Sequence, residues 1–198
     1  GEVSRREAVA LRSGVIGFAL QDAARNLLPY ATAVQNVEFA QRRQAVRPRQ
    51  LLDQLGMSSL ADKQVSTLGG GEQQQVALAV AVASQPRLLL LDEPTSQLEP
   101  AERDQVVGLI DLLNQEVSMT VIAVTHDPAV AASMPRTVTM RDGRVGTEGR
   151  RGQDFAVVGM DGSVQLPPDV LEILPPGSLL QLHRHPDGID MRRSERSE

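Results

Sequence analysis

The chain has 198 residues, of which 41% are hydrophobic, and its 20 basic and 25 acidic side chains give a net charge of −5. This length allows one sizeable core and a small appendage. The absence of cysteine excludes a disulfide framework and a thiolate metal site. An acidic chain with three Phe, one Tyr and no Trp is poorly suited to coat or stack on nucleic acid, so no nucleic-acid partner is expected.

The first third of the chain predicts a helix, a short strand and then a long helical segment. Ser4 and Glu7 have the spacing of a capping box, which opens the first helix. The apolar residues 15–20 predict a strand that ends at Gln21. From residue 22 to residue 85 the spacing is mainly helical, which indicates a helical subdomain inserted into an α/β domain.

Two local motifs lie within this helical segment. Thr32 and Gln35 form a second capping box. Residues 67–74 are a glycine-rich turn, Thr-Leu-Gly-Gly-Gly-Glu-Gln-Gln, and a helix over residues 75–84 is expected after it. Such a turn presents backbone N–H groups to an anion, so it is a candidate phosphate contact. The alternative is an ordinary loop before a core helix, and an isolated Gly-Gly-Gly favours that alternative.

Two apolar strands in the middle of the chain end in polar side chains. Residues 87–92 are the continuous apolar run of a central parallel strand covered on both faces, and this run ends in Asp92 and Glu93. A second buried strand over residues 120–125 ends at His126. Because the carboxyl ends of parallel strands meet at one edge of a sheet, these side chains are expected at a common ligand-binding edge.

The segment between these two strands predicts a helix. It begins near Pro100, a residue type that favours the first turn of a helix. Its apolar residues are expected to form one buried stripe: Val106, Val107, Leu109, Ile110, Leu112 and Leu113. Strand, helix and strand together indicate a doubly wound α/β architecture.

Asp92 and Glu93 are the candidate catalytic pair. An aspartate at a strand end can hold Mg²⁺ directly or through water, and a neighbouring glutamate can polarise an attacking water. A strand that ends in a solvated acidic turn explains the pair equally well when the motif is taken by itself.

Beyond residue 149 the pattern changes to short apolar runs separated by glycine and proline turns. The runs are residues 155–158, 164–166, 179–182 and 189–191. They predict a small β-rich domain over residues 150–198, after an α/β domain over residues 1–149. The segment 161–168 and the later Leu-Pro-Pro-Gly turn faintly resemble the swapped-hairpin domains of bacterial transition regulators, which can bind DNA. Because four arginines face four acidic residues from Arg184 to Glu198, a dimerisation or regulatory appendage is the favoured interpretation.

The order of the motifs resembles that of an ATP-binding cassette (ABC) ATPase over residues 1–146. The motifs that carry the resemblance are Gln21, Gly69-Gly70-Gly71-Glu72-Gln73, Leu88 to Glu93, Ser96-Gln97-Leu98-Glu99 and His126. Residues 17–21 and 26–29 look most like the ATPases of lipoprotein-release and macrolide-export transporters. The resemblance implies a partial P-loop NTPase fold of the α/β class with a helical subdomain, followed here by the small β-rich domain.

The resemblance also implies roles for the matching positions. Glu93, His126 and Gln21 would be catalytic, and Asp92 and Gln21 would hold Mg²⁺. The turn would cap the ATP bound to the opposite subunit, and the loop from Ser96 would cross the dimer interface. The nucleotide-binding residues would then be Gly69, Gly70, Gly71, Glu72, Gln73, Ser96 and Glu99.

This sequence departs from the family pattern at several positions. Gly69 stands where the signature usually has serine, and Glu99 replaces the usual loop aspartate. The P-loop motif Gly-x-x-x-x-Gly-Lys is absent, because Lys63 is the single lysine and its neighbours Asp62 and Gln64 do not fit. The chain is therefore either the downstream part of a longer cassette or a shortened protein. In both cases we expect it to bind ATP poorly by itself and, without the first strands, to expose apolar surface and a sheet edge.

For the complete protein, the resemblance implies an ATP-hydrolysing motor subunit of an ABC membrane transporter. Its cofactors would be ATP and Mg²⁺, and its partners a transmembrane permease subunit and a second cassette in a homo- or heterodimer. The resemblance, together with the lack of an apolar run of the roughly 18 residues that span a membrane, implies a cytoplasmic location at the inner face of the cell membrane. The alternatives are a non-hydrolysing interaction module and a soluble cassette protein that acts on translation or DNA repair.

Overall fold

The computed structural model describes residues 4, 15–41, 46–116, 119–141, 143–150 and 153–194. The helix predicted from Ser4 lies outside these residues. The chain forms two compact units, Gly1–Met134 and Pro135–Glu198. The second unit therefore includes residues before 150 that the sequence analysis assigns to the α/β domain.

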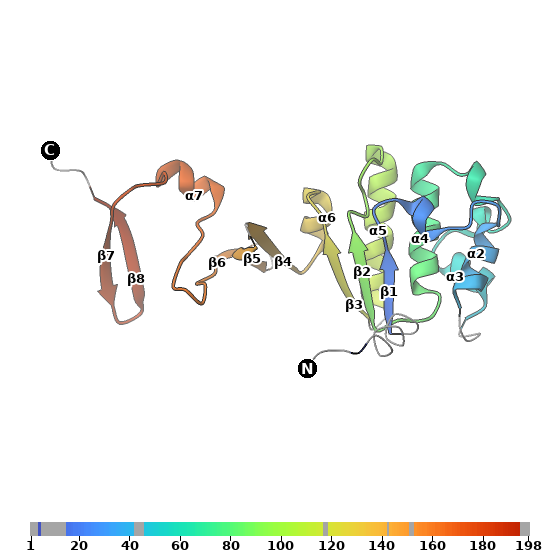
Figure 1. Ribbon diagram of the computed structural model, residues 1–198, viewed down its shortest axis with the longest axis horizontal. Helices are drawn as coiled ribbons and strands as arrows, with labels where there is room; N and C mark the ends of the chain where they lie inside the picture. The colour runs from blue at the N-terminus through green and yellow to red at the C-terminus, as the bar shows by residue number, and fades with distance from the viewer. Residues whose placement is uncertain are drawn as a thin grey trace. The chain divides into compact units, whose positions relative to one another are not determined.

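The first unit is built on a three-stranded parallel sheet (Figure 1). Its strands are β1 (Ile16–Ala19), β2 (Leu88–Asp92) and β3 (Thr120–Val124), in the order β1-β2-β3. All three strands that the apolar runs predict are present. Because β2 is central and every pair is parallel, the carboxyl ends of the three strands lie at one edge.

The region between β1 and β2 is helical, but it consists of short pieces and not of one long element. They are η1 (Ala23–Asn26), α2 (Ala33–Ala40), α3 (Pro48–Gln54), η2 (Ser58–Leu60), η3 (Val65–Thr67) and α4 (Gly70–Val82). The capping box that opens α2 is confirmed, because the Gln35 N–H donates to Thr32 Oγ1 and the Thr32 N–H donates to Gln35 Oε1. The helix expected over 75–84 begins earlier, so most of the glycine-rich turn forms the first turn of α4.

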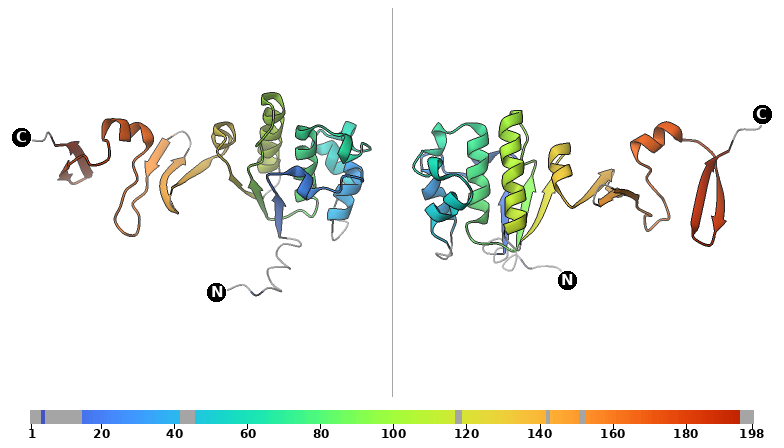
Figure 2. Two further views of the ribbon diagram at one scale, coloured as in Figure 1. Left: turned by 45° about the horizontal axis from the view of Figure 1, so that its top comes forward. Right: turned by 180° about the vertical axis from the view of Figure 1, so that it is seen from behind.

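One face of the sheet packs against α4 and against α5 (Pro100–Glu116), which Figure 2 shows beside the strands. Gly17 lets the backbones of β1 and α4 approach each other closely, because a Cβ at this position would lie 2.3 Å from the carbonyl oxygen of Ala81 in α4. The side chains of α5 that enter the core are Val106, Leu109, Ile110 and Leu113. Leu112 was predicted within this stripe but is 36% exposed, because it lies beyond the edge of the buried helical face.

Among the described residues, apolar side chains on the opposite face of the sheet are exposed, which contradicts the expectation that β2 and β3 are covered on both faces. Phe18 is 38% exposed, Ile122 is 51% exposed and Val124 is 63% exposed, whereas the alternate residues Leu89 and Leu91 are buried. The two long helices lie on one side of the sheet, so alternate residues of each strand remain accessible. These exposed side chains agree with the separate expectation that the chain presents apolar surface.

After β3 comes α6 (Pro128–Ser133), the last helix of the first unit. The second unit contains two antiparallel sheets, one of order β4-β5-β6 and one of order β7-β8. Its elements are β4 (Arg136–Arg141), β5 (Arg144–Arg150), β6 (Gln153–Ala156), α7 (Pro168–Ile173), β7 (Leu180–His185) and β8 (Gly188–Arg193).

Two features of the second unit differ from the expected β-rich pattern. The run at 164–166 forms only an isolated bridge between Val158 and Val164. The helix α7 was not predicted, and it begins at Pro168, whose fixed φ suits a first helical turn.

Candidate active site

Three loops at the carboxyl edge of the sheet hold the polar residues that the sequence analysis singles out. Gln21 follows β1, Asp92 and Glu93 end the central strand β2, and His126 follows β3. Gln21, Asp92 and His126 are exposed, whereas the side chain of Glu93 is 20% exposed. The strand order β1-β2-β3 therefore places the end of the Glu93 strand between the ends of the other two, at the common edge that the sequence predicts.

Glu93 has an unusual backbone conformation. Its φ is +46°, in the left-handed region that non-glycine residues avoid at a cost of about 1–2 kcal/mol. Its N–H donates to the carbonyl oxygen of Val124 at 2.8 Å, which continues the pairing between β2 and β3 by one residue. Strained residues of this kind persist where the surrounding structure holds them, and they concentrate at functional sites.

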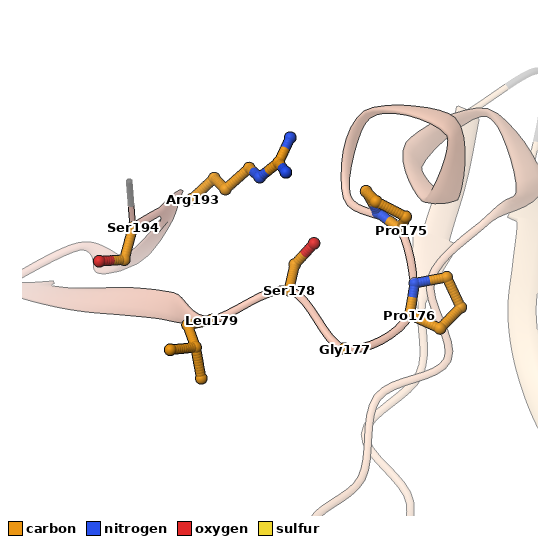
Figure 3. A pocket seen from close by; sticks show the side chains of 7 residues that line it. All are labelled: Pro175, Pro176, Gly177, Ser178, Leu179, Arg193 and Ser194. Atoms are coloured by element: carbon orange, nitrogen blue, oxygen red, sulfur yellow. The ribbon is translucent and has the colours of Figure 1, made fainter. Parts of the chain in front are cut away.

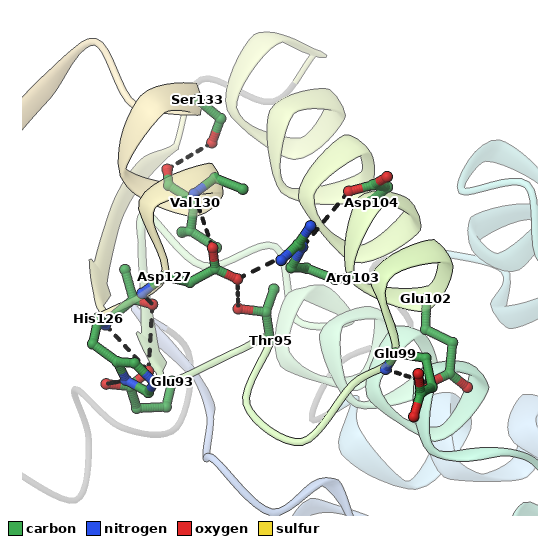
Figure 4. A network of polar contacts seen from close by, with 12 residues as sticks. Glu93, Thr95, Glu99, Glu102, Arg103, Asp104, His126, Asp127, Val130 and Ser133 are labelled. Atoms are coloured by element: carbon green, nitrogen blue, oxygen red, sulfur yellow. Dashed lines mark hydrogen bonds and ion pairs between the residues drawn. The ribbon is translucent and has the colours of Figure 1, made fainter.

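The Glu93 carboxylate is hydrogen-bonded to the loop after β3 (Figure 4). Its Oε1 lies 2.9 Å from His126 Nδ1, and its Oε2 accepts from Thr125 Oγ1 at 3.3 Å and from the His126 N–H at 3.4 Å. An ionised carboxylate has about four acceptor positions, so these three donors orient the group and leave capacity for one more. The hydrogen bond that His126 donates to the Glu93 carboxylate and then the negative charge of that carboxylate raise the pKa of His126, with a smaller contribution from the charge of Asp127.

Asp127 supports this loop, although the sequence analysis did not select it. Its Oδ1 accepts from the Ala129 N–H at 2.8 Å and thereby caps α6. Its Oδ2 accepts from Thr95 Oγ1 at 2.9 Å and lies 4.0 Å from Arg103 Nε (Figure 4). Burial raises the pKa of Asp127, but the hydrogen bonds from Ala129 and Thr95 and the charge of Arg103 outweigh it, so the pKa is lowered overall. Asp followed by Pro128 is a helix-start pattern that could have revealed this residue.

The glycine-rich turn is held by two carboxylates. The Gly69 N–H donates to Glu72 Oε2 at 3.1 Å, and the Gly71 N–H donates to Glu102 Oε1 at 3.2 Å. Gly69 and Gly70 are exposed, whereas Gly71 is buried against α5. The turn therefore combines exposed glycine backbone with donors that already have an internal carboxylate partner.

The next residues of the turn are tied to neighbouring loops. The Gln73 side-chain amide donates to the carbonyl oxygens of Val65 and Leu68, at 3.2 and 3.0 Å. The Glu72 carboxylate lies 3.6 Å from the ammonium of Lys63. The Gln73 side chain thus stabilises the turn from inside.

The loop of residues 96–99 joins the sheet edge to α5. The Ser96 N–H donates to the carbonyl oxygen of Glu93 at 3.1 Å, and Gln97 has a φ of +65°. The Glu99 N–H donates to Glu102 Oε2 at 3.1 Å. Among the described residues Ser96 Oγ is buried without a hydrogen-bond partner. Loop 96–99 therefore starts with a backbone hydrogen bond to the strained Glu93 and ends at the carboxylate that also binds the glycine-rich turn.

The described residues contain no group of three or more His, Cys, Asp or Glu side chains arranged to hold a metal ion. Mg²⁺ in nucleotide sites is usually bound by one or two carboxylates together with phosphate and water oxygens. The exposed carboxylate of Asp92 at the end of β2 fits this mode of binding.

The second unit contains an open hollow of about 600 Å³ (Figure 3). The residues that line it are Pro175, Pro176, Gly177, Ser178, Leu179, Arg193 and Ser194. Arg193 is the one ionisable side chain among these described lining residues.

Comparisons with known proteins agree with this geometry. A family model described as "ABC transporter" matches residues 1–96. The solved structure of a dimeric ATP-binding cassette, bound to ADP and Pi in a post-hydrolysis state, is 32% identical with a TM-score of 0.63. The similarity covers 78% of this chain and 70% of that chain. The chain belongs to the ABC transporter family.

Two curated ABC proteins show how much of a relative the chain represents. The macrolide export ATP-binding/permease protein MacB of Rhodopirellula baltica is 38% identical over 154 residues, which is 73% of this chain and 22% of MacB. The lipoprotein-releasing system ATP-binding protein LolD 2 of Caulobacter vibrioides is 34% identical over 151 residues, 73% of this chain and 65% of LolD 2. The chain thus spans less than two thirds of either relative.

The solved structure confirms the predicted family and the P-loop NTPase fold. Both curated names describe ATP-binding proteins of transport systems. Within the described part of the chain, the structure contains no helix that is both long and apolar enough to cross a membrane.

Proposed function

We propose that this chain supplies the hydrolytic edge of an ABC cassette that splits ATP between two cassettes and drives a membrane transporter. The observation that carries the proposal is the Glu93 carboxylate, held at the end of β2 in a left-handed backbone conformation and bonded to His126. A preorganised carboxylate of this kind is what a water-activating base requires.

In the proposed reaction a water attacks the γ-phosphorus of ATP, the bond from the γ-phosphorus to the β–γ bridging oxygen breaks, and ADP and phosphate leave. Glu93 accepts the hydrogen bond and then the proton of that water through its remaining acceptor position. His126 and Gln21, from the loops on either side, align the γ-phosphate and the water. Mg²⁺, held by Asp92, would neutralise charge on the triphosphate.

The glycine-rich turn and loop 96–99 have a different role in this proposal. Helix N-termini bind phosphate through backbone N–H groups and the helix dipole. Residues 69–73, at the start of α4, would cap the ATP held by the partner cassette, while Ser96 and Glu99 would lie at the interface between the two cassettes. Because Gly69 lacks the usual serine hydroxyl, one hydrogen bond to the phosphate of that ATP is missing. A hydrogen bond to a charged acceptor contributes about 1.5–3 kcal/mol.

The proposed partners are a second cassette, identical or different, and a transmembrane permease at the cytoplasmic face of the membrane. The resemblance to transporter ATPases supports these partners. Because the family's P-loop motif is absent from these residues, we expect the 198-residue chain by itself to bind Mg-ATP weakly. An equilibrium titration that gives micromolar affinity would contradict this expectation.

The test is the substitution E93Q in the complete gene product. It keeps the size of the side chain and its contact with His126 but removes the proton acceptor. We expect ATP turnover to fall at least about 100-fold and an ATP-bound dimer to accumulate. Phosphate release measures turnover, and size-exclusion chromatography with light scattering measures the dimer.

The matched control is E172Q, because Glu172 is an exposed carboxylate in α7 of the second unit. Its turnover should equal that of the wild type. Unchanged turnover in E93Q would remove Glu93 from its assigned role and would contradict the proposed function.

A further inference from the structure

The side chain of Glu102 connects the glycine-rich turn to loop 96–99. Its Oε1 accepts the Gly71 N–H at 3.2 Å, and its Oε2 accepts the Glu99 N–H at 3.1 Å. Figure 4 shows Glu102 on the first turn of α5, with its carboxylate turned back to Glu99. One carboxylate thus binds a donor in each of the two segments that are proposed to meet the partner cassette.

The packing around this carboxylate is close. A Cβ on Gly71 would lie 2.7 Å from the Cβ of Glu102 and 2.8 Å from its Cγ, so the aliphatic part of Glu102 lies directly against the glycine backbone. One turn further along both helices, Gln75 Nε2 donates to Gln105 Oε1 at 3.0 Å. The first turns of α4 and α5 therefore run side by side, and Glu102 occupies the contact between them.

The electrostatics of the contact resemble those of a phosphate site. Both helices begin at this point, so their N-terminal N–H groups present positive partial charge to the Glu102 carboxylate. Gly69 has no side chain that could cap α4, so at Gly71 the oxygen of Glu102 is the acceptor that satisfies the backbone donor. Carboxylate and phosphate oxygens use such donors in the same way. A phosphate that approaches the Gly71 N–H must therefore replace Glu102.

We propose that Glu102 is a positioning residue that occupies the Gly71 N–H until a phosphate of the partner's ATP displaces it. This inference rests on the proposed function, in which residues 69–73 face that ATP. Because the same carboxylate holds the Glu99 N–H, its displacement changes the hydrogen bonding at the end of loop 96–99. Glu102 thereby links the arrival of nucleotide at the turn to the loop that follows Glu93.

The test measures how much Mg-ATP is needed to form the dimer. In the complete gene product carrying E93Q, the dimer fraction is followed by light scattering while Mg-ATP is titrated. E102Q keeps the size of the side chain and removes the charge that competes with phosphate. We expect the half-saturating Mg-ATP concentration to fall at least about threefold. The matched control is Q105A, which breaks the Gln75–Gln105 bond between the same two helices and should leave this concentration unchanged.

A second measurement does not depend on nucleotide or on dimer formation. Amide hydrogen exchange of Gly71 in the nucleotide-free protein is compared between wild type and E102D, whose carboxylate is one methylene shorter. The shortened side chain should still reach the Glu99 N–H within its own helix turn but not the Gly71 N–H. We expect faster exchange at Gly71 and unchanged exchange at Gly69, whose N–H is bonded to Glu72.

The outcomes separate the two proposals. If the E93Q parent forms no dimer at any Mg-ATP concentration, the proposed function itself is contradicted. If the parent forms the dimer and E102Q needs the same or more Mg-ATP, the role of Glu102 as a competitor is overturned. Equal exchange protection of the Gly71 N–H in E102D and wild type would show that Glu102 does not hold this donor, which would overturn its proposed role.

Discussion

His126 Nδ1 lies 2.9 Å from Glu93 Oε1, although 33 positions separate the two residues in the chain. Their proximity follows from the parallel register of β2 and β3, in which Asp92 pairs with Val124. Each strand then continues into a loop on the same edge, and these loops place the imidazole against the carboxylate. The carboxylate favours the protonated imidazole, so the contact can be tested by the titration of His126.

The first prediction concerns the titration of His126. Its pKa is raised from 6.5 in the folded chain because the Glu93 carboxylate stabilises the imidazolium. The pair therefore stabilises the fold fully below pH 6.5, and this contribution disappears as the pH rises through the elevated folded pKa. An NMR titration of the His126 ring protons should show a midpoint above 6.5.

The substitution E93Q provides the control for this titration. Glutamine is neutral, so the midpoint of His126 should move down towards its ordinary value. A His126 midpoint that is the same in E93Q and wild type would show that the pair does not form in solution.

The second prediction concerns the Asp127 cap of α6. D127A removes the acceptor for the Ala129 N–H and the Thr95 hydroxyl, and we expect it to lower the free energy of unfolding by about 1 kcal/mol, within the usual 0.5–2 range for a lost cap. D127N should recover most of this loss, because asparagine is an equally good capping residue. Urea denaturation followed by circular dichroism measures both, and equal losses in the two variants would contradict the cap as the source.

The third prediction compares neighbouring positions on the two faces of β3. Ile122 is 51% exposed, whereas Val121 packs against the core. I122T should change the free energy of unfolding by less than about 0.5 kcal/mol and should reduce dye binding and aggregation, because it makes an open apolar face more polar. V121T should lower the free energy of unfolding by about 1–3 kcal/mol, because it places a hydroxyl against the core without a hydrogen-bond partner. Equal stability losses in the two variants would mean that both faces are covered.

The fourth prediction concerns Glu148 in the second unit. Arg136 and Arg150 lie opposite each other in the register of β4 and β5, and both bind the Glu148 carboxylate, which is 15% exposed. The hydrogen bond from Arg150 is the largest cause of the lowered pKa of Glu148; burial opposes it and Arg136 adds to it. The group therefore contributes stability above pH 4.5, and this contribution is lost as the pH falls through the depressed folded pKa.

The measurement is a series of thermal unfolding curves of wild type and E148Q across pH. E148Q should unfold at a lower temperature at neutral pH, because two like charges then face each other without a counter-ion. The difference should vanish in acid, where Glu148 of the wild type is protonated. E172Q, which removes an exposed carboxylate of α7, should behave as the wild type throughout, and a difference for E148Q that persists in acid would argue against the ion pair.

Much of this protein could be read from its sequence, because the informative patterns are local. The apolar run that ends in Asp92 and Glu93 has the period and the length of a strand, and the Thr32 capping box lies within four consecutive residues. The order of the motifs was sufficient to predict the family, and the parallel strands that it implies place Gln21, Glu93 and His126 at one edge of the sheet.

Only the tertiary structure decided which face of the sheet is covered by helices and which backbone N–H groups are hydrogen-bonded to side chains. The sequence led us to expect exposed apolar surface, but strand patterns do not reveal which face of a sheet a helix covers, so they did not identify Ile122 and Val124 as the exposed residues. Nor does spacing along the chain show that Glu102, from the next helix, binds the Gly71 N–H. Both facts depend on how α4 and α5 pack against the sheet and against each other, and such contacts join residues that no local pattern relates.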